Sequence, residues 1–160
     1  MKNWLLGAAG LLLVILCVSL GLYLHLNGQQ RTLLETGKTL AHEKTDINEV
    51  LSVDQYNGKV PYIVVQGITK KGEPLVAWFK GNQVDAVEDM NRLVSKKSVI
   101  QAIVNKNPRA EIIHVIPGED GQQKFWEALF VDSKNKFNYY YIDMYTGQFI
   151  KSYQLQQATS

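Results

Sequence analysis

The sequence has very little cysteine and no large excess of charge of either sign. Its 160 residues include a single cysteine, Cys17, which excludes a disulfide-stabilised scaffold. Lysine and arginine number 17 against 15 acidic residues. This balance excludes a strongly basic nucleic-acid-binding protein, which needs clustered, uncompensated positive charge. What remains is a small chain with an ordinary hydrophobic content of 46%, too short for a large enzyme with a deep cleft.

Familiar catalytic motifs are also missing. The patterns G-x-S-x-G, H-E-x-x-H and G-x-G-x-x-G do not occur in the sequence. His42 is expected on the polar side of a helix, and a strand around His114 would place Glu111 on the opposite face, which is unsuitable for a shared metal ion. We therefore predict that the protein is not an enzyme, with no catalytic residues, no metal and no cofactor.

Charge is absent from a long stretch near the N-terminus. No charged residue occurs between Lys2 and Arg31, and residues 4–26 are almost entirely apolar. As a helix, about 20 such residues span the roughly 30 Å hydrocarbon core of a bilayer. The alternative is a cleaved signal peptide, but its apolar core is usually only about 7–15 residues long. We predict an uncleaved transmembrane anchor at residues 4–26, with residues 1–3 as a short cytoplasmic head.

The charges that flank this run hardly determine its orientation. Because the head is too short to form a domain, we expect residues 27–160 to lie outside the cell membrane. Small residues at helical spacing would share one side of the span and let another transmembrane helix approach closely. The alternative is that glycine is simply common in membrane helices. The candidate packing residues are Gly7, Gly10, Cys17 and Gly21.

After the predicted span, the sequence reads as two copies of one unit, at residues 27–84 and 85–160. Residues 31–44 and 96–106 have apolar positions at helical spacing, and each stretch is followed by strand-like segments separated by turn residues. A shift of 63 residues superposes the copies and places Tyr62 on Phe125 and Trp78 on Tyr141. The predicted strands are residues 50–55, 60–69, 75–81, 111–116, 124–132, 137–145 and a short final strand near 148–153.

Sequential strands joined by tight turns and preceded by a helix favour an antiparallel sheet with the helix on one face. We therefore predict an α+β fold: an N-terminal transmembrane helix followed by two tandem cystatin-like αβββ units. Residues 85–93 are predicted to form a short helix that leads into the second unit.

Alternation in the predicted strands separates two sets of side chains. An aliphatic set that includes Ala77, Phe79 and Ile142 suits the face covered by a helix, and an aromatic set points the other way. Exposed tyrosine and tryptophan are typical anchors for a partner. The alternative is that these faces bury each other between the two copies. The candidate partner-binding residues are Val76, Trp78, Tyr139, Tyr141 and Tyr145.

The end of the second unit carries a recognisable pattern. Residues 140–150 read YYIDMYTGQFI, which resembles the closing hairpin Y-x-x-x-D-x-x-T-G-x-(V/I) of PepSY-like modules. The first unit, with VDQYNG at 53–58 and YIVVQG at 62–67, lacks the D-x-x-T-G ending at residues 80–83. Taken over all 160 residues, this layout resembles the YpmB/TseB-like family of Gram-positive bacteria.

That resemblance implies a non-enzymatic regulator of cell-wall elongation. It would be anchored in the lipid bilayer, with both units outside, and would bind a class B penicillin-binding protein. Neither nucleic acid nor a small-molecule substrate is expected as a partner. The alternative implied by PepSY-like relatives is an extracytoplasmic peptidase inhibitor or propeptide-like binding module, which would present loops such as residues 117–121 or 133–136 to a cleft.

Overall fold

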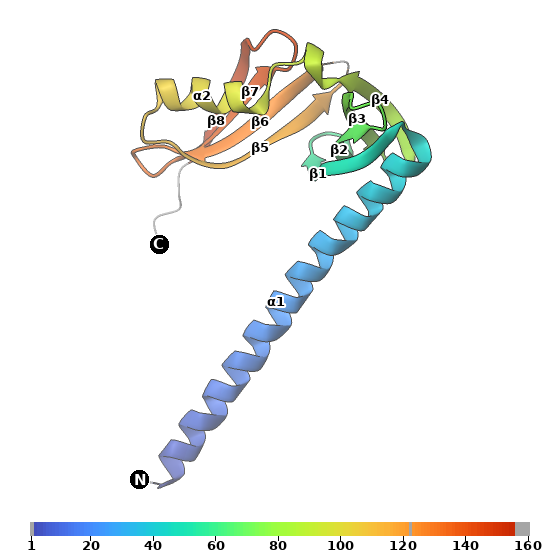
Figure 1. The fold of residues 1–160 in the computed structure, drawn as a ribbon. Helices are drawn as coiled ribbons and strands as arrows, with labels where there is room; N and C mark the ends of the chain where they lie inside the picture. Colours follow the sequence, from blue (N-terminus) through green and yellow to red (C-terminus); the bar gives the residue numbers. More distant parts are fainter. Residues whose placement is uncertain (1, 122, 156–160) are drawn as a thin grey trace. The chain divides into compact units, whose positions relative to one another are not determined.

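The computed structural model describes the backbone of residues 2–121 and 123–155, and side-chain burial for residues 12–19, 28–121 and 123–155. Residues 1–36 and 37–160 form two compact units, and each is described by itself. The first compact unit contains most of helix α1 (Lys2–Lys44). The second compact unit contains the last turns of that helix and two β-sheets, one from each predicted repeat. Figure 1 shows these elements in chain order.

The predicted span at residues 4–26 falls within α1. Among the residues that the structure describes, no helix combines the length and the apolar character needed to cross a bilayer. Cys17 is exposed and forms no disulfide. Gly7, Gly10 and Gly21 lie outside the residues whose side-chain surroundings are described. Both the membrane-spanning role of this segment and its packing face stay predictions.

The first sheet is antiparallel, with strand order β1-β2-β3-β4. Its strands are β1 (Ile47–Asn57), β2 (Pro61–Thr69), β3 (Pro74–Lys80) and β4 (Gln83–Asp89). Residues alternate across this sheet, so Val65, Ala77 and Phe79 face the end of α1 and form a small core with Leu40 and Ala41. The aliphatic face predicted for the first repeat, residues 27–84, is therefore confirmed.

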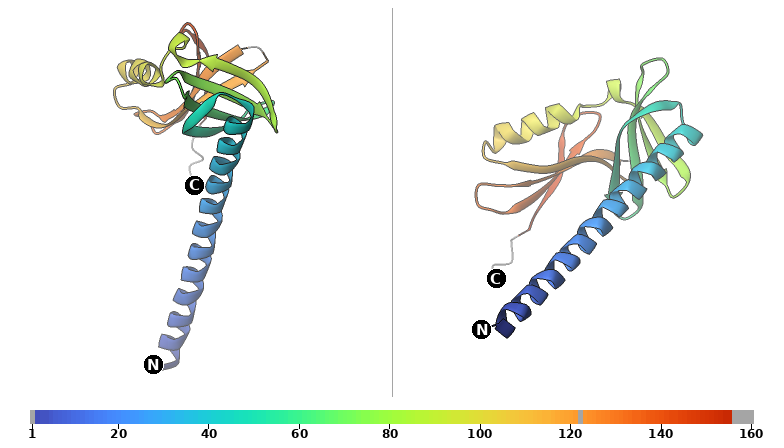
Figure 2. Two further views of the ribbon diagram at one scale, coloured as in Figure 1. Left: turned by 45° about the vertical axis from the view of Figure 1, so that its right-hand side comes forward. Right: turned by 60° about the horizontal axis from the view of Figure 1, so that its bottom comes forward.

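The second sheet repeats this arrangement, with strand order β5-β6-β7-β8. A short 3₁₀ helix, η1 (Met90–Arg92), precedes α2 (Lys96–Lys106), whose N-cap Ser95 accepts a hydrogen bond from the Ser98 amide. The strands are β5 (Glu111–Asp120), β6 (Gln123–Val131), β7 (Phe137–Asp143) and β8 (Phe149–Leu155). Helix α2 lies against one face of this sheet (Figures 1 and 2), so the predicted α+β class is confirmed. Strand β4 is added to the three strands predicted for the first repeat, and β8 corresponds to the short final strand predicted for the second.

The internal repeat is visible in the strand register. Every β2·β3 residue pair recurs 63 positions later as a β6·β7 pair; for example, Val64 opposite Trp78 becomes Glu127 opposite Tyr141. The first strands are related by 62 residues instead, because Asp54 faces Val64 whereas Ile116 faces Glu127. The connection between equivalent positions is therefore one residue longer in the second copy, with ten residues between Ile116 and Glu127 against nine between Asp54 and Val64.

One hydrophobic cluster joins the two sheets. From the first sheet it contains Val64, Val76 and Trp78, and from the second sheet and α2 it contains residues such as Trp126 and Ile103. Trp78 and Trp126 are among its largest fully buried side chains. Of the two alternatives left open for Val76 and Trp78, the structure matches packing between the copies.

The expected short helix at residues 85–93 is wrong. Residues up to Asp89 belong to strand β4, paired with β3, and only Met90–Arg92 is helical. Gly81 explains the difference, because its φ of 57° at the first position of the Gly81-Asn82 turn suits a tight hairpin that returns the chain along β3. The spacing of Asp85, Glu88 and Asp89 resembled a polar helix face, yet cross-strand pairing decided the structure.

The expected turn at residues 117–121 is wrong for most of its length. Pro117, Gly118 and Glu119 are buried in β5 and pair with β6. A Cβ added at Gly118 would lie 2.6 Å from the ring of Phe125 and 2.9 Å from that of Tyr56. Glycine is needed here because two aromatic rings cross the backbone closely, a reason that a Pro-Gly pair in the sequence does not reveal.

Candidate functional site

The face of the second sheet opposite α2 is the candidate functional site. Tyr140 and Ile142 of β7 line a small groove beneath Ala102 and Ile103 of α2, which places them on the helix-covered face. Because neighbouring strand residues point to opposite sides, Tyr139 and Tyr141 lie on the other face. The predicted direction of these two tyrosines is therefore confirmed.

Cross-strand pairs extend this aromatic surface onto the edge strand β8. Tyr153 lies opposite Tyr139, and Lys151 lies opposite Tyr141. Tyr153 and Leu155 are each 53% exposed, which is high for large apolar side chains in a sheet. We call this surface the tyrosine face and define it by Tyr139, Tyr141, Lys151, Tyr153 and Leu155.

Ring contacts make the tyrosine face rigid. Tyr141 packs edge-on against buried Phe125, with ring centroids 5.2 Å apart, and against Tyr153 at 5.8 Å. The ammonium of Lys151 lies 4.8 Å from the Tyr141 ring centroid and 5.6 Å from that of Tyr153. Such edge-to-face and cation–π contacts hold large side chains in one geometry, so binding would cost little side-chain entropy.

A half-buried carboxylate lies beside these rings. Glu127 is directly opposite Tyr141, and its Oε1 lies 3.4 Å from Nε2 of His114. Burial raises the pKa of Tyr141, and the neighbouring Glu127 carboxylate raises it further. Tyr56 behaves in the same way, since burial, Glu127 and Asp120 raise its pKa to about 12. Both hydroxyls therefore stay protonated at neutral pH.

The other predicted partner-binding residues lie elsewhere. Val76 and Trp78 are fully buried in the shared core, so they contribute to stability and have no exposed surface to offer a partner. Tyr145 follows the end of β7, where strand alternation no longer applies, and its hydroxyl donates to Glu88 Oε1 at 2.8 Å. The structure thus brings Tyr139 and Tyr141 together and separates them from the other three.

Sequence reasoning missed Lys151, Tyr153 and Leu155 as part of this surface. A signal was present, because the predicted final strand near residues 148–153 contains alternating large side chains. Only the β7·β8 register shows that Tyr153 and Leu155 share a face with Tyr139.

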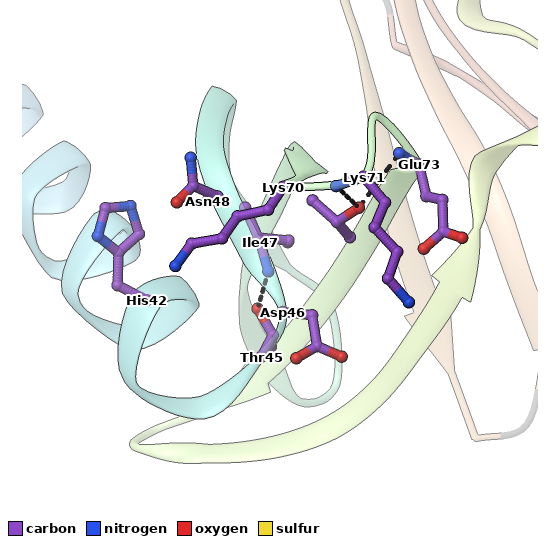
Figure 3. A pocket seen from close by; sticks show the side chains of 9 residues that line it. His42, Thr45, Asp46, Ile47, Asn48, Lys70, Lys71 and Glu73 are labelled. Atoms are coloured by element: carbon purple, nitrogen blue, oxygen red, sulfur yellow. Dashed lines mark hydrogen bonds between the residues drawn. The ribbon is translucent and has the colours of Figure 1, made fainter.

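A polar pocket of about 480 Å³ lies at the other end of the second compact unit (Figure 3). Its walls come from the end of α1, the start of β1 and the turn between β2 and β3. The hydroxyl of Thr69 already accepts hydrogen bonds from the amides of Lys71 and Glu73, and that of Thr45 donates to the carbonyl of Ala41. Two lysines face one aspartate and one glutamate, so the pocket favours neither sign of charge. Its lining residues are His42, Thr45, Asp46, Ile47, Asn48, Thr69, Lys70, Lys71 and Glu73.

Within the described part of the chain, no three histidine, cysteine, aspartate or glutamate side chains are placed to hold a metal ion. Glu111 and His114 do not act as a pair, because His114 instead contacts Glu127.

Comparisons with known proteins point to one family. Residues 36–80 match the model described as the cell wall elongation regulator TseB-like domain. The probable cell wall elongation regulator TseB of Bacillus subtilis (strain 168) is 25% identical over 142 residues, which cover 88% of each chain. The solved YpmB protein from Bacillus subtilis has the same fold, with a TM-score of 0.63 at 24% identity over 74% of this chain and 94% of that one. A family model, a curated relative and a solved structure thus agree that this chain is related to the YpmB/TseB-like proteins.

Proposed function

We propose that this protein is a membrane-anchored regulator of cell-wall elongation that acts outside the membrane by binding a class B penicillin-binding protein. The observation that carries the proposal is the similarity to the probable regulator TseB, which extends over 88% of both chains. The role proposed is that of a binding protein, in keeping with the non-enzymatic reading of the sequence.

The anchor in this proposal is the uncharged run at residues 4–26. Its 23 residues are enough for a helix to cross a bilayer, and Lys2 provides a positive charge on the proposed inner side. With Lys2 on the inner side, the two sheets would be presented outside the membrane.

The tyrosine face is the proposed contact surface. It combines exposed Tyr153 and Leu155 with half-buried Tyr139 and Tyr141. Tyrosine is enriched at sites where a few residues supply most of the binding energy, because it offers a large rigid surface and a polar hydroxyl. The alternative role as a peptidase inhibitor loses one of its two candidate loops, since most of residues 117–121 lie buried in β5.

Crosslinking in native membranes tests the proposal. The full-length chain should co-purify with a class B penicillin-binding protein, identified by a fluorescent penicillin and by mass spectrometry. We expect Tyr153→Ala to weaken this association by about 2 kcal/mol, roughly thirtyfold, as for an interface anchor. The matched control is Leu51→Ala, because Leu51 is 56% exposed on the first sheet.

Two outcomes would contradict the proposal. Recovery of only cytoplasmic proteins would reject the extracytoplasmic regulator, and recovery of a secreted peptidase with inhibition of its activity would favour the alternative role. Equal binding by the wild type, Tyr153→Ala and Leu51→Ala would retain the regulator but reject the tyrosine face as its contact surface.

A further inference from the structure

The contact between the two sheets includes a group of charged side chains beside the shared core. Glu119 of β5 and Lys124 of β6 face Glu88 of β4 across the junction. The Nζ of Lys124 lies 3.6 Å from Glu88 Oε1 and 3.8 Å from Glu119 Oε2. The side chain of Glu119 is 6% exposed and that of Lys124 is 12% exposed. We call this group, with Asp85 of β4, the junction cluster.

Hydrogen bonds link the junction cluster to both sheets. Tyr62 of β2 donates to Asp85 Oδ2 at 3.2 Å, and Tyr145, after β7, donates to Glu88 Oε1 at 2.8 Å. Glu88 therefore receives both an ammonium and a hydroxyl from the second sheet. The hydrogen bond to Glu88 holds Tyr145 at the junction, away from the tyrosine face.

Two buried polar atoms at this junction have no hydrogen-bond partner. They are Oε2 of Glu119 and Nε1 of Trp78. The ammonium of Lys124 lies 5.4 Å from the centroid of the Trp78 ring, so it is shared between two carboxyl groups and an aromatic ring. A buried carboxylate oxygen without a donor favours the protonated, neutral form of the group.

The balance of charge in the junction cluster also favours the protonated form of Glu119. If Glu119 is ionised, three carboxylates, those of Asp85, Glu88 and Glu119, face the single ammonium of Lys124. Burial raises the pKa of Glu119 above 4.5; the ammonium of Lys124 opposes this, whereas the carboxylates of Asp85 and Glu88 raise the pKa further. Proton uptake by Glu119 leaves two carboxylates and provides a donor that can reach Asp85.

We propose that the junction cluster is a proton-controlled contact between the two repeats: protonated Glu119 holds the sheets together, and its ionisation loosens them. This device depends on geometry within the second compact unit and not on the proposed partner. It would couple the packing of the two repeats, and hence the stability of the tyrosine face, to the pH around the protein.

The test is the pH dependence of stability in the full-length chain in detergent. A group whose pKa is raised by folding stabilises the protein below its unfolded value and loses that contribution as pH rises through the folded value. Wild-type stability should therefore fall as pH rises above about 4.5, and the unfolding constant should rise roughly tenfold for each unit by which folding raises the pKa. Glu119→Gln should remove this slope and be the more stable protein at pH 8.

Two further variants keep the test decisive. Glu111→Gln changes an exposed glutamate of the same strand and should keep the wild-type slope. Lys124→Met removes the one cation of the cluster and should extend the fall in stability to higher pH. Hydrogen exchange in β4 and β5, compared between the wild type and Glu119→Gln at one pH, should be faster in the wild type at pH 8. Equal slopes, or equal exchange in both proteins, would overturn the proposal.

Discussion

At the scale of single residues, the two buried tryptophans have different polar environments. Trp126 donates its indole N–H to the carbonyl of Val94 at 2.8 Å, whereas Nε1 of Trp78 has no hydrogen-bond partner. Both rings are almost completely buried. The difference matters because removing one partner of a buried hydrogen bond leaves the other unsatisfied, while removing an unpaired donor has no such penalty.

We therefore predict that Trp126→Phe lowers the free energy of unfolding by roughly 1–2 kcal/mol more than Trp78→Phe. The two changes remove the same atoms, so the loss of ring volume is common to both. Denaturant unfolding monitored by circular dichroism measures the difference. A larger loss for Trp78→Phe would show that its contact with Lys124 outweighs the indole hydrogen bond of Trp126.

At the scale of an element, the turn between β7 and β8 depends on one carboxylate. Oδ1 of Asp143 accepts hydrogen bonds from the amide of Tyr145 at 3.0 Å and from the amide and hydroxyl of Thr146 at 2.8 and 2.9 Å. Burial alone would raise the pKa of Asp143, but these hydrogen bonds lower it below 3.8. The D-x-x-T-G motif that the sequence analysis singled out is therefore a turn-forming device.

Replacing Asp143 should change how the free energy of unfolding depends on pH. Asp143→Ala should lower the free energy of unfolding by roughly 1–2 kcal/mol at pH 7, because three donors lose their acceptor. A carboxyl group with a depressed folded-state pKa stabilises the protein above its unfolded value, and that contribution disappears as pH falls through the folded value. The difference from the wild type should therefore shrink below pH 3.8.

Thermal unfolding at several pH values checks this prediction. The matched control is Asp46→Ala, which removes an exposed aspartate outside this turn and should change stability little at any of these pH values. A difference for Asp143→Ala that is constant from pH 7 to pH 2 would show that the turn does not depend on the charge of the carboxylate.

At the scale of the whole molecule, two small repeats share one core. Each repeat contains about 60 residues, a size at which an isolated domain is only marginally stable. The cluster that joins the sheets takes large side chains from both, including Trp78, Phe125 and Trp126. We infer that the repeats stabilise each other, while the tyrosine face keeps exposed side chains such as Tyr153 for binding.

The proposed membrane topology predicts where a new thiol would react. Ser133 is exposed in the turn between β6 and β7. A cysteine substituted there, Ser133→Cys, should react with a membrane-impermeant thiol reagent on intact cells whose wall has been removed. Cys17, inside the proposed span, should not react. Labelling of Ser133→Cys only after lysis would reverse the orientation.

Local patterns in the sequence were enough to predict much of the fold. The helix at residues 96–106 agrees with α2, and residues 137–143 agree with β7, because apolar periodicity depends only on neighbouring residues. The 63-residue repeat was also predictable, since it relates residues on a single chain. Residues 85–93 and 117–121 were mispredicted, because long-range strand pairing placed them in β4 and β5.

The sequence by itself determined the elements, the repeat and the opposite directions of neighbouring tyrosines in β7. Only the tertiary structure decided which of these faces is buried. Trp78 and Tyr141 occupy equivalent positions in the two repeats. Trp78 is nevertheless enclosed by the second sheet, whereas Tyr141 is half-exposed. The physical reason is that burial depends on which sheet covers which face, and no local pattern encodes a contact between residues that lie about 60 positions apart in the chain.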